Sequence, residues 1–352
     1  MSTDTAPAPA AAEGPAPGAP AISAVICTHN RADHLRRAVA SLQEQTLPAD
    51  RFEIIVVDNG STDATRDVVE EFAGAPHPIR YIYEPVLGLS RARNTGWRRS
   101  RAPLVAYLDD DAIAAPDWLE RLVESFRAEA WTAGCVGGLI EGNWEAPRPG
   151  WLHDVLLPCL TVIDWKKDAP APVTKGCFVA GANIAFRRDL LERAGGFAEN
   201  LGRKGGSLLS AEERDMTERV EALGFCTVYD PRAAVKHWVG RDRLTKRWFL
   251  ERARWQGISE AAAEMNRGTS PLRRAALAAA AMVRVQFLKN LLLTAAAPLA
   301  EDQPRLFVAR FDVVRHLAFA RSMLRGLPPE VAGSAAPRQT AAAAPAATAP
   351  GA

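Results

Sequence analysis

The sequence predicts an α/β protein with a mostly parallel sheet flanked by helices. Short runs of β-branched and aromatic residues recur in the first half of the chain, and helical patterns separate them. Strand, helix and strand in repetition require right-handed crossovers, which build a parallel sheet. With 352 residues, of which 48% are hydrophobic and 24% charged, the chain is long enough for a large core.

Strands and helices of the first half are predicted from their spacing. Apolar β-rich runs predict strands at residues 22–27, 53–57, 79–83 and 104–108. Apolar residues at helical intervals predict helices at residues 33–45, 62–72 and 90–99, the second with Ser61 as its N-cap.

The pattern changes after residue 130. Residues 131–165 are rich in Trp, Pro and Gly, so we expect irregular structure whose aromatic side chains either stack on a sugar or form a satellite core. Beyond it we expect a strand at 179–183, a helix at 208–223 and a strand at 226–229.

Both ends of the chain are dominated by Ala and Pro and hold too little apolar bulk to fold. We therefore expect disordered tails at residues 1–20 and 333–352, an α/β domain at 21–240 and a helical extension at 241–332. The first tail lacks the pattern of a secretory signal. Charged residues interrupt the apolar stretch 275–299, so no transmembrane span is expected.

Charge and cysteine content exclude several classes. The chain has 43 Lys and Arg against 41 Asp and Glu, a net charge of +2, which argues against a nucleic-acid partner. Its five cysteines show no CxxC spacing, so neither a disulfide framework nor a zinc site is indicated. We expect a protein of the reducing cytoplasm.

Polar and charged residues follow all four predicted strands, at residues 27–31, 58–63, 88–94 and 109–111. The carboxyl ends of parallel strands meet at one edge of a sheet, where ligands bind. The first turn has no glycine and therefore cannot be a GxGxxG loop, and no GxxxxGK[ST] loop is present. A diphosphate bound here would need a divalent cation held by the aspartates of residues 109–111.

The order of the motifs at these strand ends resembles that of a known family. The runs AVICTHNR, IVVDNGSTD, ARNTG and LDDD, followed by GAN, GGF and SAEE, resemble the motifs of family-2 glycosyltransferases of the GT-A fold. The resemblance covers residues 22–237. It implies an inverting hexosyltransferase that moves a sugar from a nucleotide-diphosphate sugar, expected to be a UDP-sugar, with Mg²⁺ or Mn²⁺ as cofactor.

The resemblance also implies roles for single residues. Asp58 would accept a hydrogen bond from the uracil ring, and Asp109 would contact the ribose or a metal-bound water. Asp111 is the expected metal ligand, with Asp109 and His237 as further ligands. The complete set expected at the nucleotide is Thr28, Asn30, Arg31, Asp58, Arg93, Asn94 and Asp109.

The general base is expected in the acid pair that opens the helix at 208–223. The family usually has Glu-Asp there, and this chain has Glu212 and Glu213. We expect Glu213 to be the base and Glu212 its neighbour, and the substitution leaves the choice between them open. Burial or the neighbouring acid should raise the basicity of such a carboxylate.

The acceptor is a hydroxyl group of a glycan, a lipid-linked compound or a small molecule. Cell-surface polysaccharide or glycolipid synthesis is the expected setting, and glycosylation of a natural product or a non-catalytic subunit that binds nucleotide sugars are the alternatives. Residues 241–260 combine cations with Trp248, Phe249 and Trp255. They form either a solvated helix face or a peripheral contact with an anionic membrane.

Overall fold

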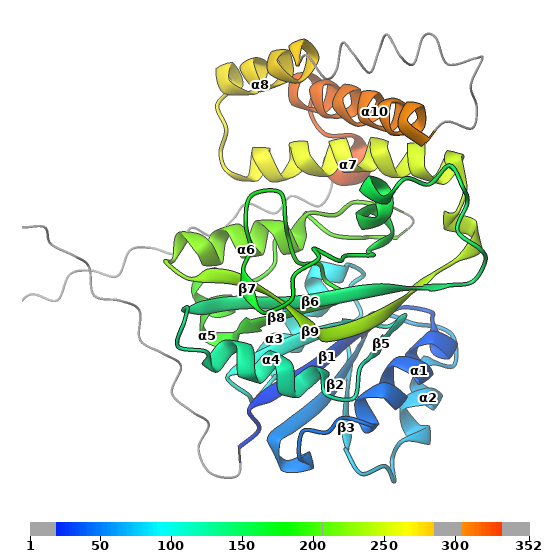
Figure 1. The fold of residues 1–352 in the computed structure, drawn as a ribbon, viewed down its shortest axis with the longest axis vertical. Helices are drawn as coiled ribbons and strands as arrows, with labels where there is room; N and C mark the ends of the chain where they lie inside the picture. The colour runs from blue at the N-terminus through cyan, green and yellow to red at the C-terminus, as the bar shows by residue number, and fades with distance from the viewer. Residues whose placement is uncertain (1–18, 206, 285–303, 333–352) are drawn as a thin grey trace, which may run out of the picture.

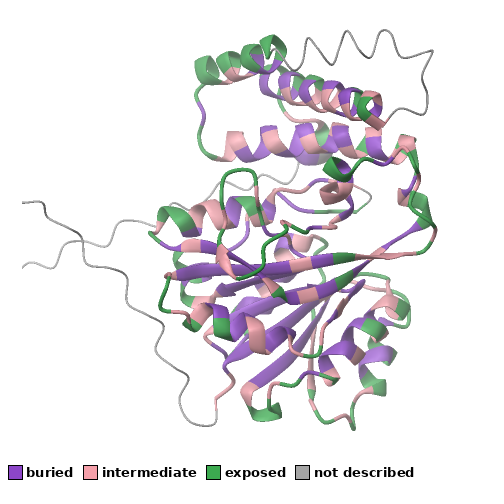
Figure 2. Ribbon diagram, in the orientation of Figure 1, coloured by how far each residue is buried: buried purple, intermediate pink, exposed green. Residues whose placement is uncertain are grey.

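The computed structural model describes residues 19–205, 207–284 and 304–332. A twisted sheet runs through the lower body, and helices cover its faces and form a separate layer above it (Figure 1). The sheet is the most deeply buried part of the molecule (Figure 2). The expected tails, residues 1–20 and 333–352, lie outside the described residues except for residues 19 and 20.

The first half of the sheet is parallel. β1 (Ile22–Thr28) pairs with β2 (Phe52–Asp58) on one side and with β4 (Leu104–Asp109) on the other, and β3 (Ile79–Tyr83) pairs with β2. These four strands confirm the sequence prediction to within one residue at each end. The helices that follow β1, β2 and β3 are α1 (Ala32–Gln43), α2 (Thr65–Glu71) and α3 (Leu89–Arg99).

Helix α2 begins later than its sequence predicts. Ser61 is not its N-cap, because the helix starts at Thr65 after Ala64. The Ser61 hydroxyl instead accepts a hydrogen bond from the Asn30 backbone N–H at 2.9 Å. The carboxylate of Asp63 accepts from the backbone N–H groups of Thr65 and Ala32, at 3.1 and 3.0 Å, and so ties the start of α2 to the start of α1.

The second half of the sheet is mixed. β8 (Asn183–Arg187) runs antiparallel between β4 and β6 (Ala133–Trp144), and β6 runs parallel to β9 (Cys226–Val239). Two short strands, β5 (Ala112–Ala114) and β7 (Ala171–Pro172), pair antiparallel with β9. Among the described residues the strand order is therefore β3-β2-β1-β4-β8-β6-β9-β5, with β7 beside β9. Helices α4 (Trp118–Arg127) and α5 (Arg188–Arg193) complete this half.

The expectation of irregular structure over residues 131–165 is wrong for its first part, which forms β6. The glycines of this segment favoured irregular structure, because glycine weakens a strand. In the folded sheet neighbouring residues lie so close to some of these positions that a side chain would overlap them. A Cβ on Gly134 would lie 2.7 Å from the Cβ of Phe225, and a Cβ on Gly138 would lie 2.7 Å from the carbonyl oxygen of Asp230. The rest of the segment contains the 3₁₀ helix η2 (Asp154–Leu160).

Three further boundaries differ from the prediction. Residues 180–183 form a turn, in which the Asn183 N–H donates to the Ala180 carbonyl at 2.9 Å, so the strand begins only at Asn183. Helix α6 (Glu212–Ala222) cannot begin at residue 208 because Ala211 has a φ of 85°. Strand β9 extends far beyond the predicted residues 226–229 and includes His237.

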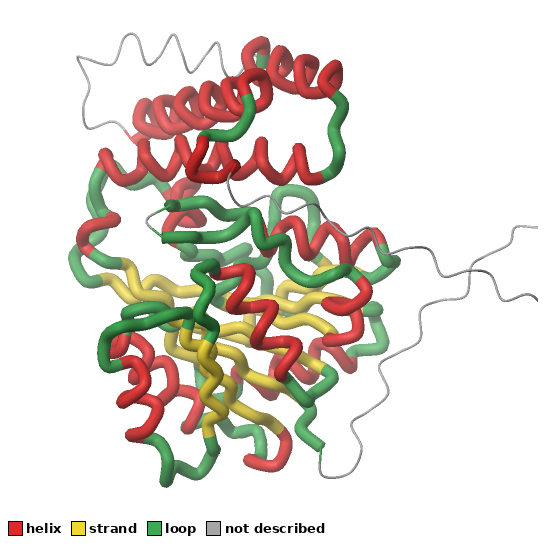
Figure 3. Tube along the Cα trace, turned by 180° about the vertical axis from the view of Figure 1, so that it is seen from behind, coloured by secondary structure: helices red, strands yellow, loops and turns green. Residues whose placement is uncertain are grey.

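The C-terminal part is helical, as expected. Its helices are α7 (Lys246–Asn266), α8 (Pro271–Val283), α10 (Pro304–Arg325) and α11 (Pro329–Ala332). Helices α7, α8 and α10 lie together above the sheet in both views (Figures 1 and 3). Much of the apolar stretch 275–299 lies outside the described residues. No helix within the described ranges combines the length and the apolar character that a membrane span requires.

Two of the three aromatic residues considered for a membrane contact within residues 241–260 pack inside the protein, whereas Trp248 is half-buried. Phe249 is fully buried and Trp255 is 8% exposed. Phe249 packs in a cluster with Leu156, Val239 and Phe307, so it joins α7 to the sheet and to α10.

Candidate active site

One large cavity lies between the carboxyl ends of the parallel strands and the C-terminal helices. Its volume is about 1310 Å³. Thr28 and Asp109 line it from the ends of β1 and β4, Glu213 from α6, His237 from β9 and Arg252 from α7. Elements from the whole described chain therefore converge on a single site.

Asp109, Asp111 and His237 form a candidate metal centre. Each offers one ligand atom, and the three atoms lie within 4.8 Å of one another. Asp109 ends β4, and Asp111 precedes β5. The pairing of Ala112 in β5 with His237 in β9 brings the imidazole beside the carboxylates. The Trp238 N–H also donates to the Asp111 carbonyl at 2.9 Å, which fixes the turn against β9.

Cations surround the Asp111 carboxylate. Arg31 Nη1 lies 2.7 Å from one of its oxygens, His237 Nε2 lies 3.2 Å from the other, and Arg243 lies 3.7 Å away. Burial alone would raise the pKa of Asp111, but the charge and hydrogen bond of His237, followed by Arg31 and Arg243, hold it well below its ordinary value. For the adjacent Asp110, burial and the charge of Asp111 raise the pKa to about 7.

The residues present fit a divalent cation. Two carboxylates and one imidazole, all within reach of a single ion, are ligands that Mn²⁺ accepts, and carboxylate oxygens suit Mg²⁺ as well. The Nδ1 atom of His237 is buried and has no hydrogen-bond partner among the described residues. The other ring nitrogen, Nε2, faces the Asp111 carboxylate at 3.2 Å. A cation among the acids would relieve the repulsion between the carboxylates.

A second acidic pair lies across the cavity at the start of α6. Arg93, only 2% exposed, donates from Nη1 to Glu212 at 2.9 Å and to Glu213 at 3.1 Å. Its other terminal nitrogen lies 3.5 Å from Asp109. The guanidinium of Arg93 therefore links the glutamate pair to the candidate metal centre.

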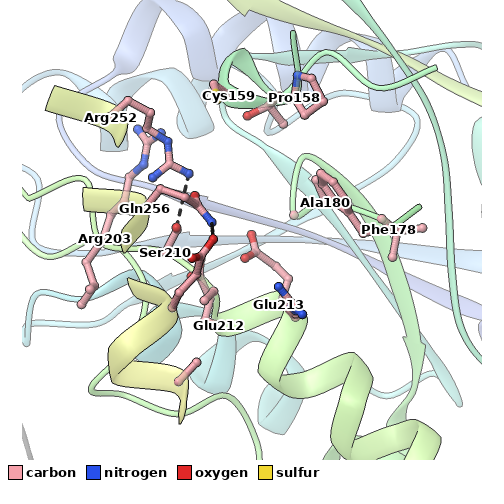
Figure 4. Close-up of a pocket in the computed structure, with 18 of the residues that line it drawn as sticks. Pro158, Cys159, Phe178, Ala180, Arg203, Ser210, Glu212, Glu213, Arg252 and Gln256 are labelled. Carbon is pink, nitrogen blue, oxygen red and sulfur yellow. Dashed lines mark hydrogen bonds between the residues drawn. The ribbon is translucent and has the colours of Figure 1, made fainter. Parts of the chain in front are cut away.

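The two glutamates have different environments. Burial, and then the charge of Glu213, raise the pKa of Glu212 to about 8. Burial would raise the pKa of Glu213 too, but Arg93 and hydrogen bonds to its charged form outweigh burial and lower it. The side chain of Glu213 is 20% exposed against 3% for Glu212. Glu213 is thus the ionised and accessible member, and it points into the pocket in Figure 4.

Gly181 allows this arrangement. A Cβ on this residue would overlap both the Arg93 guanidinium and the Glu213 carboxylate. The absence of a side chain on Gly181 therefore lets Arg93 and Glu213 lie close to the turn before β8.

The structure separates the seven residues expected at the nucleotide. Thr28, Arg31, Arg93 and Asp109 line the cavity, whereas Asn30, Asp58 and Asn94 are not among its lining residues. Thr28 donates to Asp110 at 2.9 Å. The guanidinium of Arg93 contacts the glutamate pair described above.

The three residues outside the cavity hold neighbouring backbone or side chains. The side-chain oxygen of Asn30 accepts from the Thr62 N–H at 2.7 Å, which joins the loops after β1 and β2. The Asp58 carboxylate accepts from the Ser61 N–H at 2.8 Å and from the Tyr81 hydroxyl at 2.6 Å.

Asn94, expected at the nucleotide, contacts a distant loop in this structure. It is 2% exposed, and its amide both donates to the Phe197 carbonyl at 2.9 Å and accepts from the Phe197 N–H at 2.8 Å. An amide that satisfies both backbone groups of a distant loop is fully used in holding that loop. Asn94 therefore clamps the segment after α5 onto α3.

Arg203, Gln256 and Arg252 are among the residues of the cavity wall that the sequence did not indicate. Arg252 belongs to residues 241–260, expected to form either a solvated helix face or a membrane contact, but it lines the cavity and donates to the Leu208 carbonyl and to Ser210 (Figure 4). Arg203 stands in a loop without any motif, so no local signal marks it. The cavity forms only when the C-terminal helices pack over the sheet.

Comparisons with known proteins agree with this architecture. Residues 23–195 match the model of glycosyl transferase family 2. Glucosyl-dolichyl phosphate glucuronosyltransferase of Haloferax volcanii is 28% identical over 242 residues, which cover 68% of this chain and 76% of that protein. Validoxylamine A glucosyltransferase of Streptomyces hygroscopicus is 31% identical over 229 residues, 58% of this chain and 52% of that protein.

A solved structure shows the same fold. Mannosyltransferase PcManGT from Pyrobaculum calidifontis, in complex with GDP-Man and Mn²⁺, has a TM-score of 0.59 at 24% identity and covers 92% of this chain and 90% of its own. Its likeness confirms the predicted α/β architecture of the GT-A type. Residues 23–195 of the chain thus belong to glycosyl transferase family 2, and with its relatives the chain is a glycosyltransferase.

Proposed function

We propose that this enzyme transfers a sugar from a nucleotide-diphosphate sugar, with UDP as the expected nucleotide, to an acceptor hydroxyl with inversion at the anomeric carbon. The observation that carries the proposal is the placement of the Asp109, Asp111 and His237 group and of an ionised Glu213 on one cavity, joined through Arg93. Direct displacement needs both a site for the leaving diphosphate and a base for the incoming hydroxyl.

Asp109, Asp111 and His237 are the residues that would hold Mg²⁺ or Mn²⁺. Bound there, the cation supplies positive charge that stabilises the leaving nucleotide diphosphate. Arg31 and Arg243 stand beside the same carboxylates and add positive charge to that wall of the cavity. Thr28 and Arg31 at the end of β1 are the residues that would lie nearest the nucleotide.

Glu213 is the proposed general base. An ionised carboxylate that faces the cavity can accept the proton of the acceptor hydroxyl as the hydroxyl attacks the anomeric carbon. Arg93 holds the carboxylate in place and keeps it ionised. Glu212, which is buried and has a raised pKa, would remain protonated and support its neighbour.

The acceptor is proposed to belong to polysaccharide or glycolipid synthesis. One relative is named for its action on glucosyl-dolichyl phosphate, which is a glycolipid. A second candidate function is the glycosylation of a small natural product, favoured by the validoxylamine relative. Residues 21–240 would form the catalytic domain, and residues 241–332 would close the acceptor side of its cavity.

The decisive experiment is a screen of purified protein against a panel of nucleotide sugars, with release of the nucleotide as readout. We expect one donor to be hydrolysed or transferred in the presence of Mn²⁺ or Mg²⁺, and EDTA to abolish that reaction. Asp111→Asn should abolish it as well, whereas Asp33→Asn, at a side chain that is 93% exposed, should not. Full activity in EDTA would overturn the metal-dependent mechanism, and a protein that binds a donor without turnover would be a binding subunit.

A further inference from the structure

Two arginines face one another on the wall of the cavity formed by α7 and the loop before α6. Figure 4 shows the side chains of Arg203 and Arg252 pointing toward each other, with Glu213 reaching into the same pocket. Arg252 is fixed by donating to the Leu208 carbonyl at 3.2 Å and to the Ser210 hydroxyl at 3.3 Å. Both of its partners are neutral.

Neither guanidinium forms an ion pair with a described carboxylate, although the charges of Glu212 and Glu213 act on Arg252 from a greater distance. Within the described ranges, no carboxylate lies at ion-pair distance from Arg203 or Arg252. Arg315 at the same cavity is paired with Glu260 at 3.0 Å, and Arg243 lies 3.7 Å from Asp111. Two facing cations repel each other, and burial followed by the charge of Arg203 lowers the pKa of Arg252. An anion between them would remove this repulsion.

The position of the pair indicates which substrate carries that anion. Arg243 stands at the candidate metal centre, where the donor diphosphate is expected. Arg252 instead holds Ser210, in the segment that leads directly into Glu212 and Glu213. An anion bound by Arg203 and Arg252 therefore lies on the side of the proposed base, where the acceptor must present its hydroxyl.

We infer that Arg203 and Arg252 form a subsite for a phosphate group carried by the acceptor. Two guanidinium groups provide fork-shaped donors that match the geometry of phosphate oxygens. The acceptor would then be a phosphate-bearing compound, anchored by its phosphate while its hydroxyl meets Glu213. This inference rests on the proposed function, because it takes Glu213 as the mark of the acceptor side.

A binding titration tests the subsite. The protein is first saturated with Mn²⁺ and the nucleoside diphosphate of its donor, so that the donor site is filled, and glucose 1-phosphate is then titrated and followed by calorimetry. We expect glucose 1-phosphate to bind and methyl glucoside not to bind. Arg252→Gln and Arg203→Gln should each weaken binding by about 10- to 100-fold, the usual range for hydrogen bonds to charged groups.

Further variants separate a loss of phosphate binding from other effects of substitution. Arg247→Gln removes an exposed cation from the same helix and should leave the affinity unchanged. Arg203 makes no side-chain hydrogen bond to any described residue that its replacement could break, so Arg203→Gln should fold even if Arg252→Gln does not. Arg252→Lys should retain part of the affinity, since it keeps the charge and loses the fork.

Two results would overturn the inference. One is equal affinity of wild type and both glutamine variants for glucose 1-phosphate. The other is binding of glucose 1-phosphate to the free protein but not to the protein saturated with nucleoside diphosphate. The two arginines would then bind the phosphates of the donor. A wild type that hydrolyses no nucleotide sugar would contradict the proposed function instead, and that assay is independent of the titration.

Discussion

Glu212 and Glu213 are adjacent and chemically identical, yet their surroundings give them different protonation. Arg93 donates to both and both line the cavity, but the side chain of Glu213 is 20% exposed and that of Glu212 only 3%. Glu212 keeps one oxygen buried without a hydrogen-bond partner among the described residues, which is costly for an ionised carboxylate and acceptable for a protonated one. The sequence indicates that the general base is one of these two glutamates. The choice between them depends on their burial, which only the structure shows.

The first prediction concerns turnover. Glu213→Gln keeps the size of the side chain and removes the base, so the turnover number should fall by about 10²–10⁴-fold, the usual contribution of general-base catalysis. Glu212→Gln should cost less, because Gln can still accept the hydrogen bond from Arg93. Steady-state kinetics with the identified donor measures both. A larger loss for Glu212→Gln would move the base by one residue.

The second prediction concerns stability against pH. The pKa of Glu212 is raised from 4.5 to about 8, so between these values the folded protein binds a proton that the unfolded chain has lost. Raising the pH through this window therefore lowers the free energy of unfolding. The Glu212→Gln variant lacks this carboxyl group and its pH dependence. As the pH is raised from about 5 to about 8.5, the melting temperature of the variant should therefore rise relative to that of wild type. An unchanging difference across this range would contradict the raised pKa.

At the scale of elements, β6 and β9 form the pairing on which the active site depends. β9 carries His237, and β6 runs parallel to it from Ala133 to Trp144 with two irregularities in register. The second irregularity falls between Gly138 and Ile140, beside the bend of β9 around Asp230. The backbone of β9 approaches Gly138 so closely that no side chain fits there.

The third prediction tests this close approach. A Cβ at Gly138 would overlap the Ala233 carbonyl oxygen and lie 2.7 Å from that of Asp230, so Gly138→Ala must push the two strands apart. We expect a loss of about 1–3 kcal/mol in the free energy of unfolding, the usual range for overpacking. Gly150→Ala is the matched control, because a Cβ there meets nothing within 4 Å. Denaturant titration compares the two, and equal stability would show that β9 can yield.

These elements also show which parts of the fold and of the site the sequence predicts. The strands β1, β2 and β4 were predicted because each is a run of mostly buried apolar residues. Strand β3 is only half-buried, and its isoleucines and tyrosines predicted it. Strand β6 was not predicted, because its glycines are explained only by neighbours distant in sequence, such as Phe225 and Ala233. The metal group was predicted from its motif, whereas Arg203 and Arg252 enter the cavity through tertiary packing alone.

At the scale of the whole molecule, the C-terminal helices complete the cavity. Arg252 and Gln256 of α7 and Phe311 of α10 line it together with strand ends of the sheet. An aromatic group joins the two parts: Trp151 lies 5.4 Å from Phe249 and 4.8 Å from Phe307 between ring centroids. Of the two roles open to the aromatic residues of 131–165, Trp151 therefore takes that of a satellite core.

The last prediction tests this junction. Phe249 is fully buried among Leu156, Val239 and Phe307, so Phe249→Ala leaves a cavity and should lower the free energy of unfolding by about 3–5 kcal/mol. Phe249→Leu should cost less, because it fills most of the space. Leu272→Ala on α8, at a side chain that is 82% exposed, is the control and should change little.

Because the same junction holds Arg252 over Glu213, Phe249→Ala should also impair turnover under conditions in which the protein is still folded. Circular dichroism and kinetics on one preparation separate the two effects. If Phe249→Ala kept the wild-type melting temperature, α7 would be held by its other contacts, and the role assigned to the aromatic cluster would be wrong. If stability fell while turnover of the folded fraction stayed at the wild-type level, the helices would stabilise the enzyme without shaping its active site.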